Sequence, residues 1–386
     1  MKKVLLAPYF GLGHSMPFIA MAAHMRGLGL EPYLAAEPAA LERGAEAGCK
    51  PLELPPDVVE IATTVRGITT TEEFAEALST LAQRSAPFLR KALGELGAEG
   101  VVTDSLHLGA GLAAEASGLP WASAAVTPFE LSPAMAAGSQ AIIPTAELRQ
   151  SLGLPETDRN SLQQGLSPTL HILPWTPDFD LAAPPPASKH VGTLVLDPDP
   201  LAESLDEAVK RFVDTPKPKV LVTATSSPID AADPMVEEFL NDAAEALGSL
   251  DVAGLVSINR SMALEQPVPD HVLVSPFLPH AAILPHCDFI VTNGGWGTVS
   301  RTLALGIPVV MVPIFLDQPC NAELCTKLGV ARALEYEDLT PEDLAALLQE
   351  VLDAPESLQS ATATCRATMR ELGGAPEAAR AIAAML

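Results

Sequence analysis

The chain has 386 residues, 48% hydrophobic and 4% aromatic, and its 48 acidic against 23 basic residues give a formal net charge of −25 at pH 7. A chain of this length exceeds what a single hydrophobic core usually accommodates and is sufficient for two domains. A strongly negative field repels phosphate backbones and anionic lipid, so neither nucleic acid nor a membrane surface is an expected partner. A nucleotide ligand stays possible, because backbone N–H groups and helix termini hold phosphate without a basic surface.

The cysteines and the first residues indicate a cytoplasmic protein. The five cysteines are scattered, odd in number and without zinc-finger spacing, which is typical of reduced thiols. The start resembles a signal peptide only superficially, because Pro8 breaks the apolar run and no small-residue cleavage site follows. No run reaches the roughly 18 apolar residues that a membrane span requires.

Short apolar runs alternate with amphipathic stretches throughout, which predicts parallel sheets covered by helices. In the first half the predicted strands are 3–8, 31–36, 50–54, 100–104, 121–125 and one near 169–173. The predicted helices are 15–28, 39–47, 72–96 (interrupted near Pro87) and 108–117.

A glycine-containing segment, Gly11-Leu12-Gly13-His14-Ser15-Met16, follows the first predicted strand. A dinucleotide fingerprint needs a third glycine where Met16 stands. It also needs an acidic residue closing the second strand, and Glu37 lies just beyond that position. NAD or FAD binding is therefore disfavoured here, and the absence of a Walker A sequence disfavours an NTPase.

His14 and Asp104 are candidates for acid–base catalysis. His14 stands at a predicted helix start, where the positive end of the helix disfavours imidazolium and keeps a base neutral. Asp104 ends the fourth predicted strand, and in a doubly wound sheet of order 3-2-1-4-5 strands one and four are neighbours. The alternatives are a polar loop or capping role for His14, an N-cap role for Asp104, and His107 as a competitor for Asp104.

Two predicted loops, 55–71 and 127–144, are too apolar for solvated loops. We expect them, with two residues that follow His14, to line a pocket for a hydrophobic small molecule. The candidate lining residues are Met16, Phe18, Ile61, Phe129, Met135, Ile142 and Ile143. Ordinary packing of these loops on the core is an equal alternative.

The segment between the halves is rich in proline, with Asp197-Pro198-Asp199-Pro200 before an acidic helix and Pro216-Lys217-Pro218 after it. This composition predicts a linker. The predicted domains are 1–200 and 219–386, joined by a linker at 201–218. Whether the last helix, 375–386, packs on its own domain or crosses back to the first is left open.

The second half repeats the plan of the first. Its predicted strands are 219–223, 252–258, 271–275, 289–292 and 309–312, and its predicted helices are 234–247, 281–284, 297–305, 321–328 and 341–352. Between a strand and a helix lies Asn293-Gly294-Gly295-Trp296-Gly297-Thr298, whose glycines allow backbone N–H groups to approach an anion at a helix start. Thr298 is expected to cap that helix and donate to phosphate. A plain strand-to-helix turn is the alternative.

Several motifs of the second half occur together in a fixed order. These are Pro276-Phe277-Leu278-Pro279-His280, the glycine turn at 293–298, Gly306-Ile307-Pro308, and Asp317-Gln318-Pro319-Cys320-Asn321. They resemble the donor-binding stretch of family 1 glycosyltransferases, the group that includes bacterial antibiotic glycosyltransferases. The resemblance covers about 50 residues closely, and the layout loosely. It implies two Rossmann-like domains facing across a cleft, the GT-B fold.

The resemblance also implies roles for individual residues toward a nucleotide diphosphate sugar. Phe277 takes the place of the aromatic that stacks on the nucleobase, and Leu278 offers backbone hydrogen bonds to the base edge. Gly295, Gly297 and Thr298 match the diphosphate cradle, and Ser226 matches a serine that touches the diphosphate. Asp317 and Gln318 match the pair that binds the sugar hydroxyls. In the first half, His14 and Asp104 match the catalytic histidine and its supporting aspartate.

Three positions depart from the family pattern. Asn293 stands where a phosphate-binding histidine is usual, and it donates a hydrogen bond without charge. Arg301 replaces a ribose-binding glutamate or threonine, and it can pair with phosphate. Thr225 replaces the glycine expected before Ser226. The identity of the donor is therefore open.

The sequence predicts an inverting glycosyltransferase that moves a hexose from a UDP or dTDP sugar to a small hydrophobic acceptor. We expect no metal and no other cofactor, since no acidic cluster lies near the glycine turn. One rival is a sugar-nucleotide epimerase or a cell-wall enzyme of the same fold, which the Gly13-His14 context disfavours. The other is a non-catalytic binding or partner protein, which Asn293 and Arg301 favour.

Overall fold

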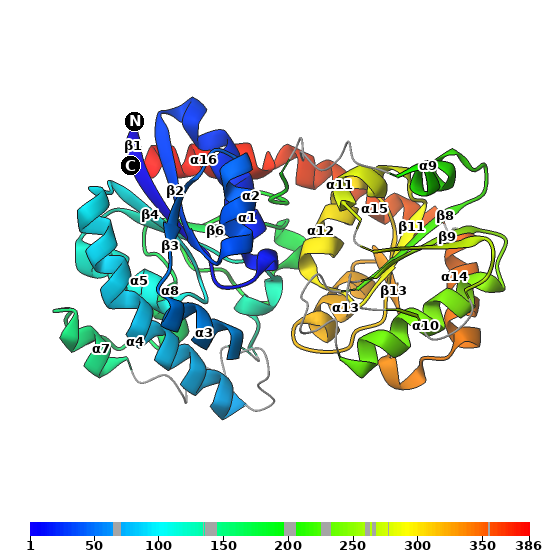
Figure 1. Ribbon diagram of the computed structural model, residues 1–386, viewed down its shortest axis with the longest axis horizontal. Coiled ribbons are helices and arrows are strands. Elements are labelled where there is room, and N and C mark those ends of the chain that lie inside the picture. Colours follow the sequence, from blue (N-terminus) through cyan, green and yellow to red (C-terminus); the bar gives the residue numbers. More distant parts are fainter. Residues whose placement is uncertain are drawn as a thin grey trace. The chain divides into compact units, whose positions relative to one another are not determined.

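The chain folds into two compact units, each built on one parallel sheet. The computed structural model describes residues 1–64, 71–133, 135, 145–196, 206–224, 233–258, 263–264, 268–276, 278–353 and 356–386. Unit 1 comprises Met1–Leu196 and Leu372–Leu386, and unit 2 comprises Asp197–Glu371. Helices flank the sheet in each unit (Figure 1), which confirms the predicted class of two Rossmann-like doubly wound domains.

The sheet of unit 1 has seven parallel strands. In spatial order they are β3 (Lys50–Glu53), β2 (Leu30–Ala36), β1 (Lys2–Ala7), β4 (Gly100–Asp104), β5 (Trp121–Ala124), β6 (His171–Leu173) and β7 (Ser188–His190). β1 lies between β2 and β4, with Leu6 paired to Val102 and Ala7 to Thr103. The predicted order 3-2-1-4-5 is therefore confirmed. The short edge strand β7 was not predicted, because its three residues are only half-buried and carry no apolar run.

Helices cover both faces of this sheet. On one face lie α1 (Leu12–Met25), α2 (Pro38–Glu46) and α16 (Gly374–Met385), and on the other α3 (Pro56–Thr64), α4 (Thr71–Leu96), α5 (Leu108–Ser117), α7 (Ala146–Ser151) and α8 (Ser161–Gly165). Side chains of β1 alternate between the two cores, with Leu6 in the first and Leu5 in the second. The red helix α16 lies along α1 (Figure 1), so the last helix packs on unit 1.

The predicted interruption of α4 near Pro87 is wrong. The helix continues through Pro87, which is exposed, while its other side packs against α5. A proline inside a helix removes one backbone hydrogen bond and crowds the preceding turn. Packing of the apolar face of α4 offsets this cost, because residues such as Leu81 and Leu89 are buried on both sides of the proline.

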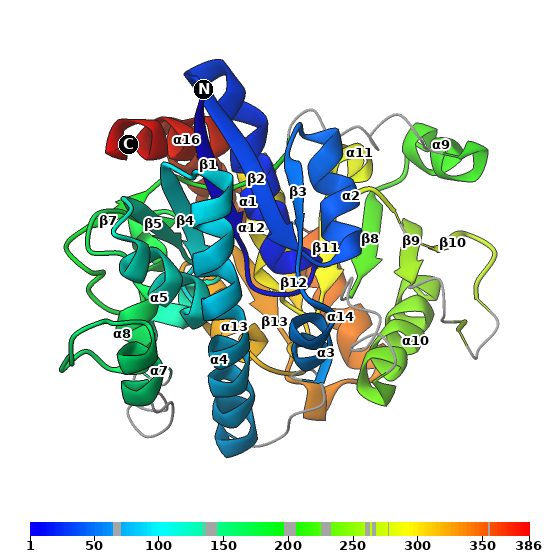
Figure 2. The same cartoon turned by 60° about the vertical axis from the view of Figure 1, so that its left-hand side comes forward.

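The sheet of unit 2 repeats this order with six parallel strands. They are β10 (Val272–Pro276), β9 (Ala253–Ile258), β8 (Lys219–Thr223), β11 (Phe289–Thr292), β12 (Val309–Met311) and β13 (Ala331–Ala333). Figure 2 shows β8 between β11 and β9. The helices are α9 (Glu207–Asp214), α10 (Pro234–Gly248), α11 (His280–Ile283), α12 (Trp296–Leu305), α13 (Gln318–Lys327), α14 (Pro341–Leu352) and α15 (Glu356–Glu371). α9 falls inside the segment 201–218 proposed as a linker, and β13 and α15 were not predicted.

In each unit the central strands end in polar residues at one edge of the sheet. β4 ends at Asp104 beside β1, and β11 ends at Thr292 beside β8. Because all strands of a sheet are parallel, their carboxyl ends share that edge, where doubly wound folds bind ligands. The fold therefore places both groups of candidate residues at such edges.

Close packing of α4 and α5 generates a testable prediction. A Cβ at Gly109 of α5 would lie 3.0 Å from Ala82 Cα and closer still to Ser85 Oγ. We expect Gly109→Ala to lower the free energy of unfolding of unit 1 by about 1–3 kcal/mol through overpacking. Urea titration followed by circular dichroism measures this change.

The matched control is Gly94→Ala in α4. Gly94 is exposed, and no described atom lies within 4 Å of an added Cβ there. The substitution should stabilise the helix by up to about 1 kcal/mol, because alanine has the higher helix propensity. Equal urea midpoints for the two variants would contradict the close approach of α4 and α5.

Candidate active site

His14 is placed by a glycine turn between β1 and α1. Gly11 has φ +97°, a left-handed conformation that favours glycine, and its carbonyl accepts from the N–H groups of His14 and Ser15. The Gly11 N–H donates to Glu37 Oε1 at 2.9 Å. The turn is thus fixed from both sides, and His14 stands in the first turn of α1.

The same contact bears on dinucleotide binding in unit 1. The Glu37 carboxylate takes a main-chain N–H at the start of α1, where a pyrophosphate would sit in a dinucleotide site. A negative side chain there repels phosphate. This geometry supports the expectation that the first glycine motif holds no dinucleotide.

The His14 and Asp104 side chains are hydrogen-bonded to each other. His14 Nδ1 lies 2.8 Å from Asp104 Oδ2, and the second carboxylate oxygen of Asp104 accepts from the Leu106 N–H at 2.9 Å. An ionised carboxylate only accepts, so Nδ1 carries the hydrogen and Nε2 is the ring nitrogen that can take a substrate proton. Asp104 is completely buried, whereas 26% of the His14 side chain is exposed. The arrangement is that of a base oriented by a buried acid.

Aromatic rings hold the position of the His14 ring. Tyr9 packs edge-on against His14, with ring centroids 5.2 Å apart, and Phe10 packs edge-on against Tyr9 at 5.6 Å. On its other side Phe10 stacks on His107 at 5.9 Å. These contacts fix the ring without using its polar atoms.

Two alternative roles considered for this region are wrong. The N-cap of α5 is His107, whose Nδ1 accepts from the Ala110 N–H at 2.9 Å, and not Asp104. Burial lowers the pKa of His107 to about 4, with the Asp104 charge acting in the opposite direction. His107 is therefore a neutral capping residue and does not replace His14 as the partner of Asp104.

The residues expected to contact an acceptor fall into three groups. Met16, Ile61, Phe129 and Met135 are partly exposed, as lining residues must be. Phe18 is fully buried in the core between α1 and the sheet, so its expected contact with a ligand is wrong. Its position in α1 directs it inward, which the sequence motif alone did not reveal. Ile142 and Ile143 lie outside the described residues.

In unit 2 the glycine turn joins β11 to α12. Gly294 has φ +92°, and a Cβ there would lie 2.8 Å from Met311 Cε, so this position requires glycine. Added Cβ atoms at Gly295 and Gly297 would meet no described atom within 4 Å. Among the described residues, nothing thus packs closely on Gly295 or Gly297, beside the first N–H groups of α12, which have no intrahelical partners.

The helix cap differs from the prediction. α12 begins at Trp296, and its N-cap is Gly295, with no side-chain hydrogen bond. The expected capping role of Thr298 is wrong, because Thr298 lies within the first turn. Its hydroxyl is not used as a cap.

Asn293 carries a buried amide beside this turn. The residue is 2% exposed, and its Oδ1 accepts from Thr292 Oγ1 at 3.4 Å. Within the described part of the chain, its Nδ2 has no hydrogen-bond partner. A buried N–H group without a partner costs about 1–3 kcal/mol. At the positive end of α12, this donor suits an anionic ligand.

The Asp317 segment is tied to the glycine turn by Asn321, a residue for which no role was predicted. Asn321 Nδ2 donates to Gly294 O at 3.1 Å and to Asp317 Oδ2 at 2.9 Å. Gln318 Oε1 accepts from the N–H groups of Ile314 and Phe315 at 3.0 and 3.1 Å. Only the amide nitrogen of Gln318 thus remains for a ligand. The sequence signal for Asn321 was its spacing of four residues, one helical turn, from Asp317.

Leu316 is the residue before Asp317. Among the described residues it is the one non-glycine residue with a left-handed φ, +59°, and its side chain is 77% exposed. For a residue with a Cβ this conformation costs roughly 1–2 kcal/mol. The hydrogen bonds of Asn321 and Gln318 on either side hold the segment in this conformation, which fixes how Asp317 is presented.

Positive charge near the glycine turn comes from Arg301 in α12. Burial lowers the pKa of His280 to about 4, and the nearby Arg301 charge lowers it further. His280 Nε2 lies 3.3 Å from Thr223 Oγ1 at the end of β8. A neutral histidine and a cation therefore lie at the carboxyl edge of the sheet. Leu278 is buried there, while Ser226 and Phe277 lie outside the described residues.

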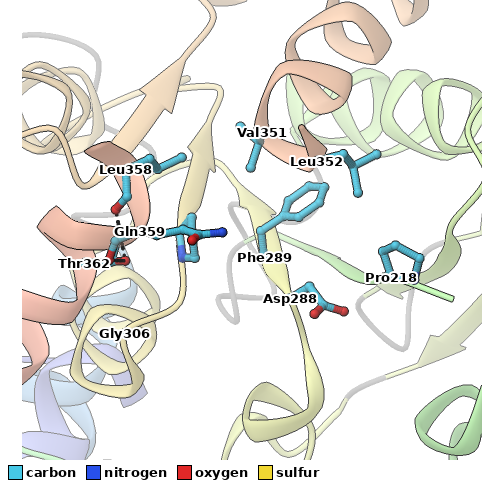
Figure 3. Close-up of a pocket in the computed structure, with 10 residues that line it drawn as sticks. Pro218, Asp288, Phe289, Gly306, Val351, Leu352, Leu358, Gln359 and Thr362 are labelled. Carbon is cyan, nitrogen blue, oxygen red and sulfur yellow. Dashed lines mark hydrogen bonds between the residues drawn. The ribbon is translucent and has the colours of Figure 1, made fainter. Parts of the chain in front are cut away.

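A pocket elsewhere in unit 2 is separate from this edge. Pro218, Asp288 and Phe289 line it (Figure 3); Pro218 precedes β8, and Asp288 and Phe289 precede and begin β11. It therefore lies at the amino edge of the sheet. The described residues contain no group of three or more histidine, cysteine and acidic side chains placed to hold a metal ion.

Comparison with known proteins shows which class of protein this chain resembles. Residues 241–384 match the family model of the erythromycin biosynthesis protein CIII-like C-terminal domain. The 4'-demethylrebeccamycin synthase of Lentzea aerocolonigenes is 31% identical over 211 residues, 54% of this chain and 48% of that protein. The UDP-glucosyltransferase avaP of Aspergillus versicolor is 30% identical over 158 residues, 40% of this chain and 33% of that protein. The match thus spans a third to a half of these relatives.

The fold comparison extends over the whole chain. The crystal structure of the glycosyltransferase VinC in complex with dTDP has a TM-score of 0.79, with 20% identity and 99% of each chain covered. These findings confirm the predicted resemblance: the chain resembles natural-product glycosyltransferases in sequence and has their GT-B fold. Among the described helices, none is both long and apolar enough to cross a bilayer.

Asn321 generates the prediction for this site. Asn321→Ala leaves Gly294 O and Asp317 Oδ2 without their shared donor, so we expect unit 2 to lose about 1–3 kcal/mol of unfolding free energy. Asn321→Asp has nearly the same shape but places an acceptor against two acceptors. It should therefore be less stable than the alanine variant at pH 7, as measured by urea unfolding. The reverse order would contradict the bracing role.

Proposed function

We propose that this chain is an inverting, metal-independent glycosyltransferase that moves a hexose from a nucleotide diphosphate sugar to a small, largely apolar acceptor. The observation that carries the proposal is the His14–Asp104 pair, in which a buried acid fixes the tautomer of a partly exposed histidine. The glycine turn of unit 2 supports a diphosphate as the second ligand, because Asn293 Nδ2 beside it has no hydrogen-bond partner among the described residues.

In the proposed reaction His14 Nε2 removes the proton of the acceptor nucleophile, most simply a hydroxyl. The nucleophile forms a bond to the anomeric carbon from the face opposite the diphosphate. The bond from that carbon to the phosphate oxygen breaks, and the diphosphate leaves with the electron pair. The configuration at carbon is therefore inverted. Asp104 stabilises the imidazolium that forms on His14.

The donor is proposed to bind to unit 2. The N–H groups at Gly295 and Gly297, the Thr298 hydroxyl and the Asn293 amide hold the diphosphate. Asp317 accepts hydrogen bonds from sugar hydroxyls, and the amide nitrogen of Gln318 donates to the sugar. Asn321 holds the sugar-binding and the phosphate-binding segments in a fixed arrangement, since it bonds to both of them.

Metal independence is part of the proposal. Charge on the departing diphosphate is stabilised by the positive end of α12, the backbone N–H groups and the Arg301 guanidinium. Arg301 lies close enough to His280 to lower its pKa, which supports a positive potential at this edge. These fixed groups serve the purpose that a divalent cation serves in other phosphate sites.

The substrate class rests on the relatives and on the pocket residues. One relative is named a UDP-glucosyltransferase, and one structural neighbour holds dTDP, so uridine and thymidine diphosphates are the nucleotides to test first. Partly exposed Met16, Ile61, Phe129 and Met135 favour a hydrophobic acceptor, such as a natural product.

The catalytic pair is tested by separating binding from turnover. We expect His14→Ala to lower kcat by about 10²–10⁴-fold for a panel of hydrophobic alcohols, because general base catalysis is worth that factor. The dissociation constant for the nucleoside diphosphate should stay unchanged, since His14 lies in unit 1. His24→Ala in the same helix is the control and should keep full activity. Equal loss in both variants would contradict the role of His14.

The donor site is tested by thermal shift in EDTA with a panel of nucleoside diphosphates. One of them should stabilise the wild type saturably, and Asn293→Ala should weaken its binding by roughly tenfold, the value of one lost hydrogen bond. Asn293→His should retain or strengthen binding. No response to any nucleotide would contradict the donor site, whereas binding without transfer or hydrolysis would favour a non-catalytic partner protein.

A further inference from the structure

An exposed leucine stands next to the carboxylate that is proposed to bind the donor sugar. Leu316 lies in the loop between β12 and α13, at the carboxyl edge of the sheet of unit 2, and Asp317 follows it. The two preceding apolar residues, Ile314 and Phe315, pack on the core of unit 2, whereas Leu316 is 77% exposed. Packing in the core therefore does not account for a leucine at this position.

The backbone of this loop does not favour a leucine either. The Gln318 N–H donates to Phe315 O at 3.2 Å and closes a β-turn. The two central residues of the turn, Leu316 and Asp317, have φ angles of +59° and −82°. A turn with this order of signs prefers glycine at its first central position, because a Cβ there is crowded by the backbone. Glycine would therefore suit the turn better than leucine does.

Hydrogen bonds hold this loop beside the glycine turn of unit 2. Gln318 Oε1 accepts from two backbone N–H groups of the loop. Asn321 joins the Asp317 carboxylate to the Gly294 carbonyl. A Cβ at Gly294 would lie 3.5 Å from Gln318 Cβ, so the loop and the glycine turn are in contact. The leucine is thus held in an unfavourable conformation at the edge where the donor is proposed to bind.

Exposure and backbone conformation together set Leu316 apart. A single exposed leucine is common on protein surfaces and needs no explanation by itself. Leu316, however, is also the one described residue other than glycine with a left-handed φ. Replacing it with glycine would relieve that conformation and would remove little packing. Residues that keep such a conformation cluster at sites of ligand binding, so the side chain is expected to contact a ligand.

We propose that Leu316 determines donor specificity: its side chain contacts a part of the transferred sugar that has no hydroxyl group, and it thereby favours a deoxygenated hexose. The inference rests on the proposed function, in which Asp317 accepts hydrogen bonds from sugar hydroxyls. Leucine has no polar atom, so a hydroxyl against it would lose water without gaining a partner, which weakens binding. A methyl or methylene group of the sugar in the same place buries apolar surface instead.

The first test measures kcat/KM with dTDP-glucose, UDP-glucose and their singly deoxygenated analogues. The wild type should prefer a deoxygenated donor to its parent sugar, and Leu316→Gly should reduce that preference by roughly tenfold. Asparagine has nearly the shape of leucine, tolerates a left-handed φ and bonds to hydroxyls, so Leu316→Asn should shift the preference toward the parent sugar. The exposed control Leu28→Ala should keep the wild-type preference. A wild type that prefers the parent sugar, or one preference shared by all four proteins, would overturn the proposal.

The second test measures binding without an acceptor, so it separates this inference from the proposed function. Leu316→Gly should bind dTDP as tightly as the wild type does, because the proposed contact is with the sugar, and should bind the preferred dTDP sugar more weakly. Equal loss of affinity for dTDP and for its sugar would overturn the proposal. A preference in binding without any transfer would overturn only the proposed function, whereas transfer with an unaltered preference would overturn only this inference.

The melting temperature of the ligand-free protein tests the unfavourable conformation on which the inference depends. Leu316→Gly and Leu316→Ala both remove the leucine side chain, but only glycine adopts a left-handed φ without a steric cost. We therefore expect Leu316→Gly to melt a few degrees above Leu316→Ala. The reverse order, or failure of both variants to fold, would overturn the proposal, because the leucine would then be part of the packing of unit 2.

Discussion

The bond between His14 and Asp104 depends on one constraint, the adjacency of β1 and β4 at the centre of a parallel sheet. Ninety residues separate the two side chains along the chain, yet Nδ1 and Oδ2 lie 2.8 Å apart. The pair forms because parallel strands bring their carboxyl ends to one edge. The glycine turn, the Glu37 contact and the packed rings of Tyr9 and Phe10 then orient a histidine whose place the topology has set.

In unit 2 the same adjacency of central parallel strands places a different set of polar groups at one edge of the sheet. Its central strands β8 and β11 bring Thr223 and the glycine turn to one edge, where the start of α12 supplies N–H groups. The turn is not an isolated loop, because Asn321 joins it to the Asp317 segment. In the same segment Leu316 adopts a left-handed conformation. Gln318 Oε1 accepts from the two backbone N–H groups of Ile314 and Phe315. The same strand arrangement thus places the proposed base in unit 1 and the proposed anion site in unit 2.

Burial around Asp104 decides which groups carry charge. His107 and His171, which lie near Asp104, are held neutral by desolvation. Asp104 is the buried carboxylate that bonds directly to His14. Differences in burial thus give neighbouring groups different protonation states, which acid–base chemistry at one edge of a sheet requires.

The sequence alone predicted the central architecture and much of the candidate site. Buried parallel strands appear as continuous apolar runs, so β1, β4, β8 and β11 were predicted to within a residue or two. The strand order then implied that His14 and Asp104 would meet. The glycine turn was equally visible, because its backbone conformation needs residues without a Cβ.

Other features have no local signature. The edge strands β7 and β13 are three residues long, and α4 continues through Pro87 only because α5 packs beside it. Within the site, the burial of Phe18 and the bond from Asn321 to Gly294 depend on contacts between distant segments. The sequence determined the hydrophobic periodicity of each helix or strand and the residue types at its end, because both depend only on neighbouring residues. Only the tertiary structure decided which polar atoms are buried together, and therefore which of them bond and hold protons.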